Sequence, residues 1–486
     1  MAEIQNPSEQ IVEAASHYQR NIDRMVELLE GVGKKDRIRR VGIELERFLI
    51  TRDGQTVTYK GDPGVQNLLE QLLRDVPEAR PVMIEGNLLG LTYEDAGVEV
   101  AVSLEPAAQV EVAVGPCEKL MPLRDALANF DRYVASALEE IGLDAALVAS
   151  GYNPNVQNLE SLPLIPKERY RDMDAYLSRT GRYARDMMRA SASTQISLDY
   201  ENEEEAARIY RMGTILGPLF SFLFDNAPRF RDQGGRMARS RIWKHVDCDR
   251  CGIVPGALNQ FTFERYARWV SSVNPILFTD RNHVTHATGS MSAADIMAQA
   301  DLTDDELRHL MSMVFPDIRM KGFCEIRELD ALEPDRAVAA AAFVASLLYD
   351  EGLEGKLAQK GYLRQSEPID SASVGEMRGE LERNGWRAWI FDHPVTEVVE
   401  TLKEIVEENL SDIYYEPPIY RNDCPTVRSK EEYMELDPEE MEKAEPIGGD
   451  RYVRRPDNPE RGWVHMIINQ LLYWSWDKRR SPQFAG

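Results

Sequence analysis

The sequence predicts an α+β protein built on an antiparallel β-sheet, with helices packed around it. Two observations support this fold class. The expected strands come in adjacent, hairpin-like pairs, and long segments with helical spacing are inserted between the pairs. This order favours an antiparallel sheet of α+β type over a doubly wound parallel sheet.

The individual elements follow from the spacing of apolar residues. Alternation with a period of two predicts strands at 41–50, 98–104, 109–114, 193–200, 318–321 and 323–327. Spacing of three to four predicts helices at 8–30, 118–141, 202–224, 335–349, 354–359, 374–384 and 396–409. We expect an N-terminal helix (1–36), a core of sheet and inserted helices (37–350) and a mostly helical C-terminal part (351–486), all in one compact domain.

Composition excludes several classes of partner. The 486 residues include 57 Lys and Arg against 82 Asp and Glu, a net charge of −25. Nucleic acids and anionic membranes attract basic surfaces, so we expect neither as a partner. The longest largely apolar run, 337–349, is shorter than the ~20 residues of a membrane-spanning helix. Residues 1–5 do not resemble a secretory signal, and five cysteines suggest no disulfide framework, so we expect a reducing cytoplasm.

One face of the expected strands carries acidic and amide side chains. They are Glu44, Glu46, Glu105, Gln109, Glu111, Gln195 and Glu325. A sheet with one solvated face would show the same alternation. However, 98–114 contains three glutamates and no Lys or Arg, and like charges side by side on a sheet are unfavourable. Converging carboxylates need a cation, and Mg²⁺ commonly bridges carboxylates to phosphates.

A segment of the opposite charge lies at 227–250. It contains six arginines and one lysine against three aspartates, a net charge of +4. A solvated basic loop is one interpretation. The other is a phosphate clamp, because the guanidinium group holds phosphates and carboxylates through two hydrogen bonds. Acidic strands and clustered arginines together are the two halves of a metal–nucleotide site. Neither a P-loop nor a G-x-G-x-x-G motif is present.

Seven short motifs resemble, in order, those of the glutamate–cysteine ligases of plants and many bacteria. They read GIELERF (42–48), SLEPAAQVE (103–111), TQISLD (194–199), RSRIW (239–243), DCDRCG (247–252), FPDIR (315–319) and EIR (325–327). The resemblance implies a curved, saddle-shaped sheet like that of glutamine synthetase, with helices on its convex side and the active site in its concave face. It implies ATP-dependent joining of the L-glutamate γ-carboxylate to the L-cysteine amine through a γ-glutamyl phosphate, the first step of glutathione biosynthesis.

The same resemblance assigns roles to residues. It implies two or three Mg²⁺ ions, with ATP as co-substrate, held by Glu44, Glu46, Glu105, Glu111 and Glu325. Arg239 and Arg327 would act on the phosphate or the glutamate carboxylate. Arg250, Arg319, Arg241, Gln109 and Gln195 would bind substrate or ATP, the two glutamines by orienting substrate or metal-bound water. We expect Trp243 to fill the core.

The chain departs from the family pattern in two places. Ala107 and Ala108 stand where the family usually has glycines, and Cys248 and Cys251 form a Cys-x-x-Cys that we expect to be incidental.

Two other functions fit the same residues. One is a related carboxylate–amine ligase that joins glutamate to a different amine, because the activation motifs would be common to both enzymes. The other is a non-catalytic protein that binds a nucleotide and metal. The expected partners are the small molecules glutamate, cysteine and ATP, and we expect a monomer or homodimer.

Overall fold

The computed structural model describes most of the chain. It covers residues 7–31, 39–156, 158–227, 230, 235–363 and 368–414, and the short strands β16 (Val427–Ser429), β17 (Ala444–Pro446) and β18 (Arg451–Arg454). Most of the expected C-terminal part beyond residue 414 therefore lies outside the described residues, and the proposed division into three parts stays a prediction.

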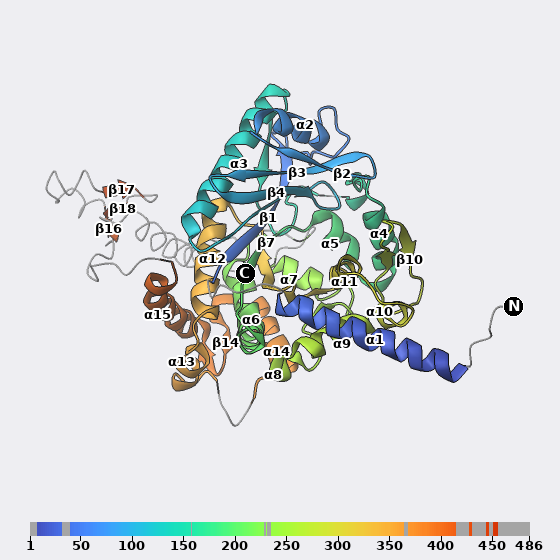
Figure 1. Cartoon of the computed structure of the whole chain (residues 1–486). Coiled ribbons are helices and arrows are strands. Elements are labelled where there is room, and N and C mark those ends of the chain that lie inside the picture. Colours follow the sequence, from blue (N-terminus) through green and yellow to red (C-terminus); the bar gives the residue numbers. More distant parts are fainter. Residues whose placement is uncertain are drawn as a thin grey trace.

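In the described part of the chain, nine strands form one large antiparallel sheet (Figure 1). Eight run in the order β12-β13-β7-β1-β5-β4-β3-β2, and β6 pairs with the end of β1. Their bounds are β1 Val41–Thr51, β2 Arg80–Ile84, β3 Asn87–Asp95, β4 Val98–Leu104, β5 Val110–Cys117, β6 Ala145–Val148, β7 Ser193–Leu198, β12 Ile318–Met320 and β13 Cys324–Asp330. The α+β class and the large antiparallel sheet are thus confirmed.

Long helices pack against the sheet and bury its apolar side chains. They are α2 (Val65–Asp75), α3 (Leu120–Glu140), α6 (Glu203–Leu223) and α12 (Pro334–Leu348), which contact β3, β5, β13 and β1 respectively. Ile43 and Leu45 of β1 are completely covered, as is Val112 of β5. Alternation along a strand turns the intervening residues, Glu44, Glu46 and Glu111, to the opposite face. Because the helices cover the apolar face of the sheet, the acidic side chains lie on the other face.

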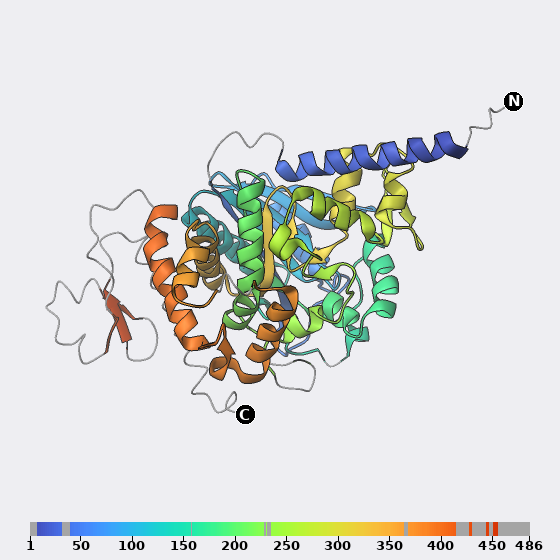
Figure 2. The same cartoon turned by 90° about the horizontal axis from the view of Figure 1, so that it is seen from below.

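Shorter elements surround that polar face. They are α4 (Glu168–Thr180), α5 (Ala184–Ala190), α7 (Ala238–Trp243), the 3₁₀ turn Leu159–Ser161, and the parallel pair of β8 (Cys251–Gly252) with β11 (Phe315–Pro316). The short helix α8 (Ala257–Gln260) packs on α6. Figure 2 shows α1 (Pro7–Glu30) along the outside of the molecule. It packs on α9 (Phe263–Ser272), α10 (Ala293–Met297) and α11 (Asp304–Met311), close to the hairpin of β9 (Leu277–Thr279) and β10 (Thr285–Ala287).

The remaining helices cover the other end of the molecule. They are α13 (Leu353–Gln359), α14 (Ser371–Asn384), the 3₁₀ turn Gly385–Arg387 and α15 (Val395–Tyr414), with the short hairpin of β14 (Trp389–Ile390) and β15 (His393–Pro394). Helix α15 packs on α12, and α14 packs on α6. No helix of the described residues combines the length and hydrophobicity needed to cross a membrane.

The predicted strands and helices are all present, and most of their ends differ from the observed ones by one to three residues. The sequence analysis missed the hairpin of β2 and β3. Its two-residue turn is Glu85-Gly86, with φ values of 50° and 75°. Two left-handed residues are typical of a type I′ hairpin turn, but a glutamate is an unusual first residue there. The turn therefore gave no recognisable sequence signal.

Candidate functional site

A cavity of about 380 Å³ lies against the sheet face that carries the acidic side chains. Its lining includes four carboxylates, from Glu44, Glu46, Glu105 and Glu111. The cationic side chains of its lining are Lys167, Arg169, Arg239, Arg319, Lys321 and Arg327. Acidic strands and a cluster of cations therefore meet in one cavity, although they come from segments far apart in the sequence.

Strand register brings the acids together. Glu46 of β1 stands directly opposite Glu111 of β5, and Ser103 of β4 stands on the other side of Glu111. On the opposite edge of β1, Glu44 faces Gln195 of β7. Side chains directly opposite each other on antiparallel strands lie about 5 Å apart at Cβ. The row of polar residues thus runs across four neighbouring strands.

Hydrogen bonds hold two of these carboxylates in place. Glu46 accepts from the backbone N–H of Ser193 at 2.8 Å and from Nε2 of Gln195 at 2.9 Å. Glu111 accepts from the Ser103 hydroxyl at 2.6 Å. Each carboxylate still has lone pairs that these donors leave unused, because an ionised carboxylate accepts about four hydrogen bonds.

The electrostatics of the four glutamates call for a cation. Burial and the neighbouring Glu111 raise the pKa of Glu46 to about 7, and burial and Glu46 raise the pKa of Glu105 to about 7. Burial and Glu105 raise the pKa of Glu111 to about 8, and burial and Glu325 raise the pKa of Glu44. Desolvation and like charges both disfavour the ionised form. A divalent cation would remove both costs.

The donor set fits Mg²⁺ in particular. Mg²⁺ takes oxygen ligands, keeps several waters and is usually held by one or two carboxylates together with substrate phosphates. Among the described residues, no three of these glutamates place their oxygens within 4.8 Å of one another. Pairs of glutamates with phosphate oxygens and water fit this spacing better than a cage made only of protein.

Glu325 has a different environment from the other four glutamates. Its carboxylate is fully buried and accepts from Nε of Arg319 at 2.6 Å and from Nη1 of Arg327 at 2.9 Å, and it also pairs with Lys321. Burial opposes its ionisation, but the three cations outweigh burial and hold the pKa of Glu325 well below its usual range. To bind a metal ion, Glu325 would have to keep a lone pair free while it pairs with Arg319, Lys321 and Arg327. Its role as a metal ligand stays a prediction.

Arg239 and Arg327 lie together at one wall of the cavity. Nη1 of Arg239 donates to the backbone oxygen of Arg327 at 2.8 Å. Both guanidinium groups lie over the ring of Trp243, at 5.5 and 5.6 Å from its centre. Nε of the buried Arg239 and Nε1 of Trp243 have no hydrogen-bond partner among the described residues. Trp243 is half-buried: it packs against the hydrophobic core, as expected, and it also lines the cavity.

Gln195 connects the acidic and cationic halves of the site. Its Nε2 donates to Glu46, and its Oε1 accepts from Nη1 of Arg327. Gln109 also lines the cavity, but its amide is engaged by backbone: Nε2 donates to Met188 and Ser191 oxygens, and Oε1 accepts from Ala107 N–H. The Gln109 side chain therefore holds the backbone around Ala107 and Ser191 in place. It would have to break those hydrogen bonds to contact a substrate.

Two predicted arginines are not brought to the cavity. Arg250 is completely buried, where Nε donates to Asp247 at 2.7 Å and Nη1 donates to the Met313 oxygen at 2.9 Å. Arg241 pairs with Glu382 at 3.3 Å. Residues two apart on a helix point about 200° apart, so Arg239 and Arg241 face opposite sides of α7. Arg229 and Arg231, which contributed to the charge of the segment, lie outside the described residues.

Several lining residues were missed by the sequence analysis. Lys321 follows Arg319 by two residues on an expected strand, so the alternation could have identified it. Lys167, Arg169 and Tyr170 gave no signal, because they form the ordinary start of helix α4.

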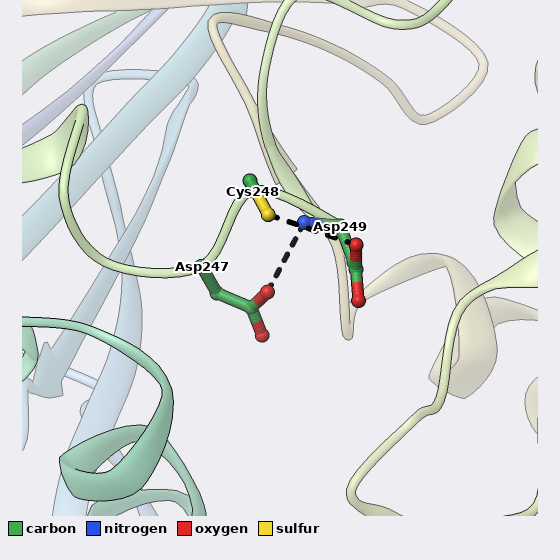
Figure 3. A group of neighbouring side chains, drawn as sticks. All are labelled: Asp247, Cys248 and Asp249. Carbon is green, nitrogen blue, oxygen red and sulfur yellow. Dashed lines mark hydrogen bonds between the residues drawn. The ribbon is translucent and has the colours of Figure 1, made fainter.

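In the Cys-x-x-Cys segment Cys248 is exposed, whereas the surroundings of Cys251 disfavour reaction. Figure 3 shows Asp247, Cys248 and Asp249, whose ligand atoms lie within 4.8 Å of one another. The carboxylate of Asp247 is already taken by Arg250 and by the Asp249 N–H at 3.1 Å. Burial and Asp247 raise the pKa of the Cys251 thiol to about 12. A thiol that is fully protonated at neutral pH is a poor nucleophile and metal ligand.

A second, smaller cavity of about 180 Å³ adjoins the first. The two share Arg239, Trp243, Phe315 and Arg327 as a common wall. The smaller cavity is also lined by Ser240, Asp317, Glu328 and, from α14, Arg378.

Comparison with known proteins places this site in a family. The chain is 28% identical over 445 residues to a chloroplastic glutamate–cysteine ligase of Brassica juncea, covering 84% of this chain and 83% of that protein. It is 28% identical over 432 residues to the chloroplastic glutamate–cysteine ligase of Arabidopsis thaliana, covering 81% and 80%.

A solved complex between the prokaryotic ubiquitin-like protein Pup and its ligase PafA aligns with 90% of this chain and 65% of that one. The identity is 11% and the TM-score 0.37, which is too low to establish a shared fold. The model of glutamate–cysteine ligase family 2 (GCS2), in contrast, matches residues 40–379, a range that holds every residue lining the main cavity. The chain belongs to glutamate–cysteine ligase family 2.

Proposed function

We propose that this protein joins the γ-carboxylate of L-glutamate to the amine of L-cysteine at the expense of ATP, the first step of glutathione biosynthesis. One observation supports the proposal most directly. In a chain of this family, four glutamates and six cationic side chains line a single cavity. This is the arrangement that phosphoryl transfer to a carboxylate requires.

The chemistry explains why both halves are needed. A carboxylate does not form an amide in water until its oxygen is made a leaving group. The γ-carboxylate attacks the γ-phosphorus of ATP, the bond to the bridging oxygen breaks, and ADP leaves. The amine then attacks the acyl carbon, and phosphate and a proton leave. Catalysis of the first step is mostly positioning and neutralisation of charge.

The residues divide these tasks. Glu44, Glu46, Glu105 and Glu111 would hold two or three Mg²⁺ ions, which when bound neutralise phosphate oxygens and orient them. Arg239 and Arg327 would bind the transferred phosphoryl group, because arginine matches phosphate geometry with two parallel hydrogen bonds. Gln195 would fix the position of the acidic side chains relative to the arginines, because it bonds to both Glu46 and Arg327. Arg319 and Lys321 would add charge at the same wall.

A coupled assay of ADP formation tests the proposal. We expect sustained ADP formation only when ATP, Mg²⁺, glutamate and an acceptor amine are present together, with cysteine the best acceptor among amino acids. EDTA should stop the reaction. ADP formation with another amine but not with cysteine would show that the protein is a glutamate ligase with a different acceptor. ADP formation that does not depend on glutamate would contradict the proposal.

We further propose that the protein works in a reducing compartment such as the cytoplasm, as a monomer or homodimer. The relatives reported above are named as chloroplastic proteins, so this compartment is a proposal for this chain alone. Among the described residues, four cysteines are free thiols. Light scattering after size exclusion and fractionation of cells would test the two statements.

A further inference from the structure

Arg378 of helix α14 reaches the back of the wall that the two cavities share. Nη1 donates to Oγ of Ser240 at 2.7 Å and to Oε2 of Glu328 at 2.9 Å. Nη2 donates to Oδ2 of Asp317 at 3.0 Å and to Oε1 of Glu328 at 2.6 Å. One buried guanidinium therefore joins a helix, a strand and the segment between β11 and β12.

Each of the three partners of Arg378 is either the sequence neighbour of Arg239 or Arg327 or hydrogen-bonded to the backbone of Arg327. Ser240 follows Arg239 on α7, and Glu328 follows Arg327 on β13. The backbone oxygen of Asp317 accepts from the N–H of Arg327 at 3.2 Å. Arg378 thus contacts the immediate surroundings of both arginines, although it lies about 50 residues or more from each in the sequence.

The two arginines need such support, because their own elements hold them weakly. Helix α7 has only six residues, and Arg239 lies on it. Arg327 lies where the pairing of β13 with β7 is interrupted, between Ile326 and Leu329. A register irregularity leaves the residues inside it without regular ladder hydrogen bonds. Short helices and bulges do not by themselves set the position of a guanidinium group.

We propose that Arg378 is a positioning residue for the ligase reaction, and that it holds Arg239 and Arg327 in the arrangement that binds the transferred phosphoryl group. This inference rests on the proposed function for its kinetic consequences. Arg378 would act from behind the wall, without contact with the reacting atoms.

A purely electrostatic role for Arg378 leads to a different expectation. The buried Glu328 and the partly buried Asp317 both pair with Arg378, and Arg378 outweighs burial to lower the pKa of Glu328 to about 2. A lysine would supply the same charge. It could not replace the planar fork, which bonds to both oxygens of Glu328 and still reaches Ser240 and Asp317. The substitution Arg378→Lys therefore separates charge from geometry.

A matched pair of serine variants separates positioning from general stability. Ser240 and Ser271 both carry buried hydroxyls. Ser240 links Arg378 to the neighbour of Arg239, whereas Ser271 of α9 donates to the backbone oxygen of Arg268 at 2.8 Å and lines neither cavity. Ser240→Ala should remove a positioning contact, and Ser271→Ala should remove a hydrogen bond of similar length that involves none of Arg239, Arg327 and Arg378.

We expect Arg378→Lys to lower kcat about 10- to 100-fold, by analogy with residues that orient metal ligands through hydrogen bonds, and Ser240→Ala, which removes a single bond, to lower it less, about 3- to 10-fold. The KM for glutamate should change less than threefold in both. Ser271→Ala should keep kcat within twofold, although its Tm falls as much as that of Ser240→Ala. Arg378→Ala is avoided, because it would leave the buried Glu328 carboxylate without its main counter-ion, which is strongly destabilising.

Two outcomes would overturn the inference. One is a kcat within twofold of wild type in Arg378→Lys and Ser240→Ala. The other is an equal loss of kcat in Ser271→Ala. If the wild-type protein forms no ADP with any amine, the proposed function fails, and the inference is then tested by calorimetric titration with Mg-ATP. Affinity should fall at least fivefold in Arg378→Lys and Ser240→Ala and remain unchanged in Ser271→Ala, and equal affinity in all would reject it.

Discussion

At the scale of single residues, the site depends on carboxylates that carry charge where charge is unfavourable. Glu46 shows this best, because it is buried, stands opposite Glu111 and still receives two hydrogen bonds that favour its ionised form. Without a cation, burial and the neighbouring carboxylate make the ionised form of Glu46 unfavourable, and a bound cation would stabilise that form. The residue is therefore suited to a metal site and poorly suited to a stable core.

Glu46→Gln should abolish turnover, with a loss of kcat of about 100-fold or more, comparable to removal of one charge-stabilising group from an active site. The folded state should persist, and its Tm at pH 8 should equal or exceed that of wild type because one like charge is removed from beside Glu111. Steady-state kinetics and thermal melts measure the two effects. A variant with a near-normal rate would refute the assignment of Glu46 as a ligand.

Ala108 is a second residue with an identifiable cost. It lies in the link between β4 and β5 with φ of 67°, where an L-residue with a Cβ is strained by about 1–2 kcal/mol. This is one of the two positions at which the family usually has glycine. The departure from the family therefore falls on a left-handed position, and Glu105 belongs to the same turn, its oxygen accepting from Ala108 N–H at 2.9 Å.

Ala108→Gly should relieve that strain, and Ala107→Gly is the matched control because Ala107 has no left-handed backbone. Glycine at an ordinary position costs about 0.5–1 kcal/mol of chain entropy. Both variants lose one buried methyl group, so we expect Ala108→Gly to be more stable than Ala107→Gly by about 1–2 kcal/mol. Urea unfolding measures the difference, and equal stabilities would contradict the strain.

At the scale of elements, function depends on how short segments present their cations. Helix α7 turns Arg239 to the cavity and Arg241 away from it, and β12 with the residue that follows it presents Arg319 and Lys321 to the cavity. The regular strands supply acids, and the short or irregular elements supply the arginines. Both sets should therefore affect phosphoryl transfer, the acids through the metal that they would hold and the arginines through direct contact with the phosphoryl group.

Arg327→Ala should lose activity mainly in the phosphorylation half-reaction. The guanidinium lines the cavity and bonds to Gln195 and to the buried Glu325, so its removal takes charge from the transferred phosphoryl group while the amine step keeps its other residues. We expect the single-turnover rate of ADP formation to fall about 100- to 1,000-fold, as for removal of one preorganised donor.

The control for Arg327→Ala is Arg268→Ala, a surface arginine of α9 that pairs with Glu264. It should retain full activity, because exposed ion pairs contribute little. Unchanged ADP formation in Arg327→Ala would place the phosphate clamp elsewhere.

At the scale of the whole molecule, the acidic cavity links stability to pH and to metal. The pKa values of Glu46, Glu105 and Glu111 are raised to about 7, 7 and 8. The folded protein therefore binds protons more tightly than the unfolded chain, whose glutamates titrate near 4.3. Stability without metal must fall as pH rises from about 4.5 to 8, since the unfolded state binds fewer protons over that interval.

Mg²⁺ should stabilise the protein more at pH 8.5 than at pH 6, because it binds the ionised carboxylates that protons occupy at lower pH. A ligand at 10–100 times its Kd stabilises by about 1.4–2.7 kcal/mol, which we expect to raise Tm by a few degrees at pH 8.5. Melting curves in EDTA and in MgCl₂ test this. A Tm shift of equal size at both pH values, or the same shift in Glu46→Gln, would contradict the coupling.

The sequence by itself determined the elements and the chemical type of the site. Alternation placed Glu44 and Glu46 on one face of a strand, because side-chain direction along a strand depends only on neighbouring residues. The order of the motifs indicated the family, and the matching family model confirms it.

Only the tertiary structure decided which residues meet. Glu46 and Glu111 lie together because β1 pairs with β5 in one register, and a shift by one residue would turn every acid to the other face. Lys167 and Arg169 line the cavity because α4 packs beside it, whereas Arg250 forms an ion pair with Asp247 and does not line the cavity. Register and docking arise from the packing of segments distant in sequence, and no local pattern encodes them. Local periodicity therefore revealed the acids, and packing selected their cationic partners.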